Sequence, residues 1–180
     1  RKKKLFRNYK KKKIDKNNRL FNKELGGGVI LDLGCYPVSL SLLISSLISN
    51  FNDQIKIENK KKEFLENGVD IDAYADIIFD NNFISYIGAS FKKNLGKKTE
   101  IVGERGKIII EDTWHGNPAK IQVIGEKNYN FDIEAKENIF SHEIESISNS
   151  IFENKSEPKY PGMSILDTFE NIKILDKWLN

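Results

Sequence analysis

The sequence predicts an α+β fold, with a largely antiparallel, open sheet of six to seven strands and helices on one of its faces. Three observations predict it. An apolar helical stretch comes first (26–48), strand-like alternation fills the middle of the chain (about 54–133), and two amphipathic helical stretches close it (139–151 and 165–178). Short turns join the alternating segments, which favours antiparallel pairing. The second face of the sheet would be solvated or would meet a partner.

The first helical stretch begins with three glycines and continues as a helix that is apolar on most sides. Pro37 lies inside it and has no N–H to donate to the carbonyl of Leu33. We therefore expect a kink or a restart of the helix at this point. A restart would place Pro37 in the first turn of the second half, where proline is tolerated.

Seven segments of the middle region carry the strand pattern. In the clearest one, Ala73, Ala75, Ile77 and Phe79 lie at every second position, and the turn signal after residue 79 leads into a hairpin. The seven segments are 55–57, 73–79, 83–91, 99–103, 107–111, 121–124 and 129–133.

The two closing segments repeat apolar residues at helical spacing. Ser164 precedes the last of them and is the expected N-cap. Asp167 follows it at the spacing of a capping box.

The composition describes one domain of ordinary size, with 180 residues of which 39% are hydrophobic and 31% charged. No uncharged apolar stretch reaches the roughly 18 to 20 residues of a membrane span, so we expect no transmembrane helix and no membrane partner. The basic start is not followed by the apolar segment of a secretion signal. A single cysteine, Cys35, excludes an internal disulfide and fits a reducing compartment, and we expect a cytoplasmic protein.

Positive charge is concentrated at the start of the chain. Residues 1–19 contain eleven Lys or Arg and one acid, Asp15. Such a basic segment suggests nucleic acid as a binding partner. Its two aromatic residues, Phe6 and Tyr9, are too few to form a platform on which bases stack. The simpler alternative is a solvated basic strand or loop at an edge, which makes nucleic acid an unlikely partner. We therefore divide the chain into a basic lead-in (1–18) and a substrate-binding, catalytic and oligomerisation domain (19–180).

Asp32 and Tyr36 are the first candidate site residues. They are four residues apart, so on a helix they share one face. A carboxylate in so apolar a run is costly unless something pairs with it, and a tyrosine can exchange a proton with an alkoxide when a cation stabilises its ionised form. The alternative is that Asp32 caps the turn after the glycines and Tyr36 is a half-buried core residue. With only two histidines and one cysteine in the chain, we expect no metal site.

The segment 19–38 closely resembles the glucose-fructose oxidoreductase and inositol dehydrogenase (Gfo/Idh/MocA) family, and most of all its glucose-fructose oxidoreductase and dihydrodiol dehydrogenase branch. Its most specific part runs Gly26-Gly27-Gly28-Val29-Ile30-Leu31-Asp32-Leu33-Gly34-Cys35-Tyr36-Pro37. The resemblance continues through the segments 69–91, 100–106 and 140–158, and covers residues 19–178 in all.

The resemblance implies a two-domain oxidoreductase. In that family a nucleotide-binding Rossmann domain comes first and supplies a lysine from an E-K-P motif. No such motif occurs in this sequence, so the lysine is expected upstream of Arg1. The second domain supplies an aspartate and, four residues later, a histidine or tyrosine, and Asp32 and Tyr36 match these positions. Tyr36 would exchange a proton with the substrate hydroxyl and Asp32 would orient the substrate, while a hydride moves to or from NAD or NADP.

Four further residues are candidate substrate-binding residues. Arg19 matches a position that is often basic in this branch, although a surface ion pair is an equally good interpretation. Gly27 and Gly28 permit a close backbone approach. Trp114 falls in a loop between strands, where it is either part of the substrate rim or an ordinary surface residue.

The expected substrate is a small carbohydrate-like molecule, such as a sugar, a polyol or a dihydrodiol. The expected assembly is a homodimer or homotetramer formed through the open face of the sheet. Without the cofactor domain the chain should bind nicotinamide poorly and catalyse nothing. Two alternatives stay open: a non-catalytic scaffold or binding member of the same fold, and a nucleic-acid-binding module that uses residues 1–19.

Overall fold

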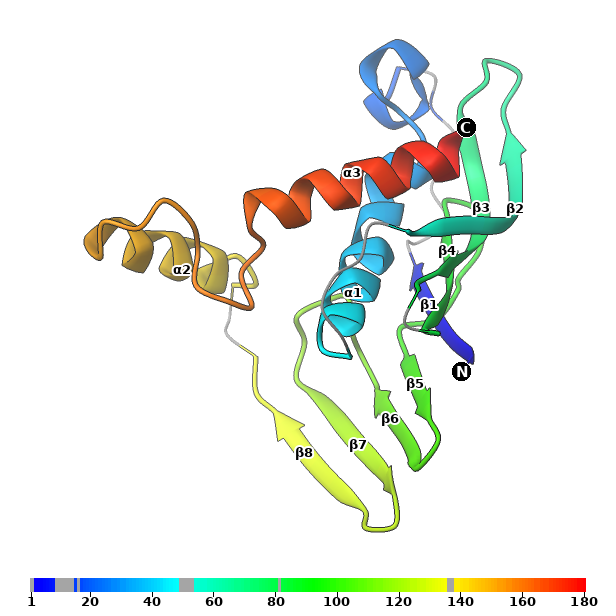
Figure 1. Ribbon diagram of the computed structural model, residues 1–180. Coiled ribbons are helices and arrows are strands. Elements are labelled where there is room, and N and C mark those ends of the chain that lie inside the picture. Colours follow the sequence, from blue (N-terminus) through cyan, green and yellow to red (C-terminus); the bar gives the residue numbers. More distant parts are fainter. Residues whose placement is uncertain (1, 9–14, 16, 49–53, 81, 136–137) are drawn as a thin grey trace.

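The computed structural model describes residues 2–8, 15, 17–48, 54–80, 82–135 and 138–180. Within these residues eight strands form one sheet in the order β2-β3-β4-β1-β5-β6-β7-β8 (Figure 1). The strands are β1 (Lys2–Asn8), β2 (Lys56–Phe64), β3 (Asp70–Ile78), β4 (Ile84–Ser90), β5 (Thr99–Gly103), β6 (Gly106–Ile110), β7 (Ala119–Gly125) and β8 (Tyr129–Ile133). The predicted α+β class with a largely antiparallel sheet is confirmed.

One strand was not expected where it lies. β1 comes from the basic lead-in, and it pairs in parallel with β4 and antiparallel with β5 at the centre of the sheet. It joins two antiparallel units, β2–β3–β4 and β5–β6–β7–β8. The expectation of a basic strand or loop at an edge was therefore wrong for residues 2–8. Their sequence has no alternation to reveal this, because its two apolar residues are adjacent. Residues 1, 9–14 and 16 of the lead-in lie outside the described residues, and the boundary at residue 18 stays a prediction.

The first helical stretch changes its helical geometry just before Pro37. Two short 3-10 helices, η1 (Arg19–Phe21) and η2 (Lys23–Leu25), are followed by a π-helical turn, η3 (Ile30–Gly34), and then by α1 (Cys35–Ser46). Pro37 lies in the first turn of α1, where proline is tolerated, but Gly34 and Cys35 keep right-handed helical backbone angles, so the predicted restart is not observed. The π turn was not predicted.

The core lies between the sheet and two helices, α1 and α3 (Ile165–Leu179), which occupy the same face of the sheet (Figure 1). Its fully buried side chains include Val38 from α1, Ile77 and Ile87 from the sheet, and Ile174 and Trp178 from α3. This packing accounts for the apolar character of α1.

The helical stretch 23–46 is long and apolar enough to span a membrane by length and composition, a property that the sequence was not expected to show. It reaches that length because the short helices and the π turn extend α1 toward the N-terminus. In the fold 56% of its most apolar window is buried. The apolar residues are therefore explained by contact with the sheet and with α3.

The last two helices differ in how they are held. α3 begins with the predicted capping box: the Ser164 hydroxyl accepts the N–H of Asp167, and the Asp167 carboxylate accepts the N–H of Ser164. At its other end the ammonium groups of Lys60 and Lys62 donate to the last free carbonyls of the helix. α2 (Ser141–Phe152) stands apart from α1 and α3 in Figure 1 and buries only Ser150.

Candidate functional site

The glycine turn before the π helix is shaped by a buried acid. Asp70 is only 2% exposed, and its Oδ2 accepts the N–H of Ile30 at 2.7 Å. Gly28 has a φ of 130°, and a Cβ on it would lie 2.1 Å from Asp70 Oδ1. No other residue fits at position 28, because both the backbone conformation and the space exclude a side chain. Burial raises the pKa of Asp70, while hydrogen bonds from the backbone amides of Ile30 and Val29 act in the opposite direction.

Gly27 allows this turn to fold onto η1. A Cβ at position 27 would lie 2.6 to 2.7 Å from the carbonyl oxygens of Arg19, Leu20 and Asn22. The N–H of Gly27 donates to the Asn22 carbonyl at 2.8 Å, and the N–H of Gly28 donates to the Leu20 carbonyl at 3.0 Å. Each glycine thus has a packing role, and their predicted contact with substrate stays a prediction.

The π turn that carries Asp32 is fixed by α3. A Cβ on Gly34 would lie 2.7 Å from Cζ3 of Trp178, so the indole ring packs directly on the backbone of the turn. The side-chain amide of Asn171 donates to the carbonyl of Cys35 at 2.9 Å, just after the turn. A π turn is wider than an α-helical turn, is rare, and occurs frequently at functional sites.

Asp32 pairs with Arg19 across the glycine turn. The Arg19 guanidinium Nη2 lies 3.2 Å from Asp32 Oδ1, with the side chains 61% and 20% exposed respectively. This contact matches the ion-pair interpretation of Arg19. It also separates Asp32 from the role of helix cap, because the amide of Ile30 is taken by Asp70.

Tyr36 is the second residue of α1 and is 45% exposed. Its ring is therefore not sealed in the core, which is the arrangement that would have removed it as a catalytic candidate. It follows Asp32 by four residues across the junction of the π turn and α1, at about one helical turn. The structure thus keeps Asp32 and Tyr36 on one helical segment, and their roles stay predictions.

Trp114 lies in the loop between β6 and β7, as predicted. The loop is organised by Asp112, whose carboxylate accepts the Trp114 N–H at 3.3 Å, His115 Nδ1 at 2.8 Å, and the side chains of Lys97 and Asn117 at 3.1 Å each. Burial alone would raise the pKa of Asp112, but these hydrogen bonds hold it well below its usual range. The indole Nε1 of Trp114 is shielded and has no hydrogen-bond partner among the described residues.

Sequence reasoning missed Asp70 and Asp112. Asp112 precedes Gly116 and Pro118, which is a recognisable turn signal. Asp70 gives no local signal, because its partner Ile30 is 40 residues away in the chain.

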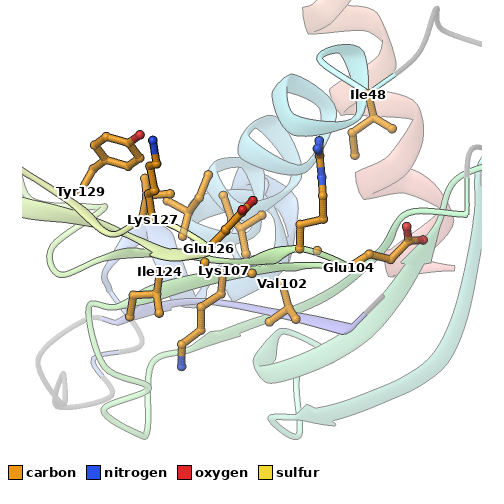
Figure 2. A pocket seen from close by; sticks show the side chains of 15 residues that line it. Ile48, Val102, Glu104, Lys107, Ile124, Glu126, Lys127 and Tyr129 are labelled. Atoms are coloured by element: carbon orange, nitrogen blue, oxygen red, sulfur yellow. The ribbon is translucent and has the colours of Figure 1, made fainter.

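A hollow of about 930 Å³ lies elsewhere, between the β5–β6 and β7–β8 turns and the end of α1 (Figure 2). Ile48 and Tyr129 lie on its α1 side, whereas the side chains of Val102, Lys107 and Ile124 point to the other side of the strands. Asp32 and Tyr36 do not line it. Among the described residues no group of three or more His, Cys, Asp or Glu side chains is placed to hold a metal ion.

The family follows from a direct match. Residues 5–109 match the sequence model of the GFO/IDH/MocA C-terminal domain, and this range contains the glycine turn, Asp32 and Tyr36. The chain belongs to the Gfo/Idh/MocA family. This match confirms the family that the sequence resemblance predicted.

Similar proteins place this family domain within larger oxidoreductases. The chain is 29% identical to trans-1,2-dihydrobenzene-1,2-diol dehydrogenase of Xenopus tropicalis, over 92% of the chain and 50% of that protein. Its fold is similar to KijD10, a 3-ketoreductase from Actinomadura kijaniata crystallised with NADP and TDP-benzene, with a TM-score of 0.73, 13% identity, and coverage of 97% of this chain and 51% of that chain.

The fold is also similar to aldose-aldose oxidoreductase from Caulobacter crescentus, crystallised with glycerol. The TM-score is 0.75 at 13% identity, with 98% of this chain and 51% of that chain covered. The chain therefore spans about half the length of the relatives that it matches.

Proposed function

We propose that this Gfo/Idh/MocA domain is the substrate-binding half of an NAD(P)-dependent oxidoreductase that acts on a sugar, a polyol or a dihydrodiol. The observation that carries the proposal is the outward-facing Tyr36, one turn after an ion-paired Asp32, in the segment that the family match covers. The related proteins are a dihydrodiol dehydrogenase, a ketoreductase and an aldose-aldose oxidoreductase, which supports chemistry at a hydroxyl or carbonyl carbon.

In this proposal the two residues divide the work on the substrate. In reduction the phenol of Tyr36 donates its proton to the alkoxide oxygen and becomes a phenolate, and in oxidation the phenolate takes the proton of the reacting hydroxyl. Asp32 accepts a hydrogen bond from a substrate hydroxyl and so fixes which carbon faces the hydride acceptor. The nicotinamide, when bound, accepts or supplies the hydride. Oxidation then converts one hydroxyl to a carbonyl, with the hydride and the proton leaving to separate groups.

The cofactor would be NAD or NADP. The chain has no G-x-G-x-x-G turn to hold the phosphates. The residues of this chain fit only the nicotinamide end of the cofactor, where the exposed Tyr36 can lie beside the ring. We therefore propose that a dinucleotide-binding domain supplies the phosphate site and the catalytic lysine, and that this chain alone is inactive.

Exposed apolar side chains on α2 and α3 support the proposal that another domain packs against these helices. On α2 the side chains of Ile144, Ile147 and Ile151 follow one face of the helix and are all exposed. On α3 the exposed apolar residues include Leu166 and Phe169. Exposed apolar side chains that share a helix face mark an interaction site, and we propose that the dinucleotide-binding domain packs here.

Two broader expectations remain proposals. A homodimer or homotetramer would form through the sheet face opposite α1 and α3, where Tyr86 lies opposite Asp76, and Ile84 opposite Ile78, in the β3–β4 register. The reducing compartment inferred from the single cysteine would be the cytoplasm.

The Tyr36→Phe variant tests the proposed function. In the protein joined to its dinucleotide-binding domain, removing the phenol oxygen should lower turnover by about 10²- to 10⁴-fold, because proton exchange with the substrate is lost. Binding of NAD(P)H, followed by fluorescence titration, should change little. Tyr160→Phe, at an exposed loop tyrosine, is the matched control and should keep full turnover. Unchanged turnover in Tyr36→Phe would refute the assignment.

A further inference from the structure

The Arg19–Asp32 ion pair joins two segments that are each held rigidly. On the Arg19 side, the Asn18 side chain caps η1 by accepting the N–H of Leu20. Leu20 and Phe21, which follow Arg19, are both buried, and the Asn67 side chain donates to the Phe21 carbonyl at 2.8 Å. The backbone of Arg19 is thus anchored to the core, and its side chain extends from there to Asp32.

The Asp32 side is equally constrained. Its N–H donates to the Gly28 carbonyl at 3.1 Å, and the turn is fixed at its start by Asp70 and near its end by the ring of Trp178 against Gly34. These contacts fix the backbone of Asp32 but do not fix the direction of its carboxylate. The guanidinium of Arg19 fixes that direction through Oδ1.

The contact uses only one carboxylate oxygen. Oδ2 of Asp32 accepts no hydrogen bond from any residue in the described part of the chain. An ionised carboxylate can accept at both oxygens, so Oδ2 is left to receive a substrate hydroxyl while Oδ1 stays with Arg19.

We propose that Arg19 is a positioning residue for Asp32, and that it acts on the reaction through this carboxylate without contacting the substrate. The inference rests on the proposed function and replaces the earlier prediction that Arg19 binds substrate.

A double-mutant cycle in the assembled two-domain protein tests the proposal. Arg19→Met should lower kcat by about tenfold or more and change KM by less than about twofold, because it misdirects a group needed at the reacting centre. In an Asp32→Asn background the same change should lower kcat by less than about twofold, since its target is already altered. Arg19→Lys should restore part of the loss, because a point charge can pair with Oδ1 but lacks the fixed fork.

The controls separate this inference from the proposed function. Arg105→Met, at an exposed arginine in the β5–β6 turn, should leave both kinetic constants unchanged. An Arg19→Met effect on KM alone, or equal effects of Arg19→Met in both backgrounds, would overturn the positioning role.

NMR of the Arg19 guanidinium gives a readout that needs no turnover: Asp32→Asn should shift these signals, and unshifted signals would refute the pair. The wild-type protein could lack turnover while the Arg19 NMR signals still shift in Asp32→Asn. That result would confirm the ion pair and refute both the proposed function and the positioning role.

Discussion

Asp70 and Asp112 are two largely shielded carboxylates whose surroundings move their pKa values in opposite directions. Burial raises the pKa of Asp70 against the opposing backbone hydrogen bonds at the start of η3. At Asp112 burial is outweighed by hydrogen bonds from His115, Asn117, Lys97 and the Trp114 amide, which lower the pKa. The contributions of the two residues to stability must therefore change with pH in opposite senses.

The opposite signs are measurable by chemical denaturation between about pH 3 and pH 7. An Asp with a raised folded-state pKa stabilises the fold most when protonated, so the stability of wild type relative to Asp70→Asn should fall as pH rises above the ordinary value of about 4. For Asp112 the folded-state pKa lies below that value. Its contribution should be complete above about pH 4 and be lost as pH falls further, relative to Asp112→Asn. Slopes of the same sign for both variants would contradict this account.

The residue scale also shows how far sequence alone can reach. Asp32, Tyr36 and Trp114 were singled out from local spacing and from family resemblance, and the structure places them on a helical segment and in a loop as expected. The partners of these residues were not predicted. The Asp70–Ile30 contact and the Arg19–Asp32 contact close over 40 and 13 residues of chain, and no periodic pattern encodes a pairing of that kind.

At the scale of elements, the π turn and α3 depend on each other through Gly34 and Trp178. The Trp178 ring is fully buried against the turn, in the space that a side chain at position 34 would need. The sequence could predict an irregularity of the helix near Pro37, because a missing N–H is a local property. It could not predict the π turn, because that geometry is set by an indole ring supplied more than a hundred residues later.

Gly34→Ala tests this dependence. The added Cβ would lie 2.7 Å from the Trp178 ring, so either the ring or α3 must shift, and overpacking of this kind costs about 1 to 3 kcal/mol. Thermal or denaturant unfolding measures the loss. Gly103→Ala is the matched control: its Cβ would meet its nearest neighbour at an ordinary 3.7 Å, and it should change stability by less than about 0.5 kcal/mol. Equal stability of the two variants would show that the ring does not constrain the turn.

Strand β1 marks the other limit of prediction at this scale. The seven other strands were expected from alternation, and the hairpins that connect them have local turn signals. β1 has neither, since its place is decided by the free edges of β4 and β5 on either side of it. A strand held by backbone pairing between two antiparallel units of one sheet can be chemically unlike the strands beside it.

At the scale of the whole molecule, the distribution of exposed apolar side chains supports the proposal that this domain packs against a second domain. α1 and the C-terminal half of α3 each bury one side in the core, whereas α2 and the start of α3 expose apolar side chains such as Ile144, Ile151 and Leu166. The relatives are about twice as long, and similar structures are known with NADP bound. Tyr36 and Asp32 would then supply proton exchange and orientation, and the other half would supply the hydride carrier.

Nicotinamide-linked turnover of the chain alone, compared with the chain joined to its dinucleotide-binding domain, tests this division of labour most directly. Sugars, polyols and trans-dihydrodiols are the substrates to assay, with nicotinamide absorbance as the readout. The account predicts no turnover by the chain alone and turnover of at least one of these substrates by the joined protein. Turnover by the chain alone, or a joined protein that binds NAD(P)H but turns over none of them, would contradict it.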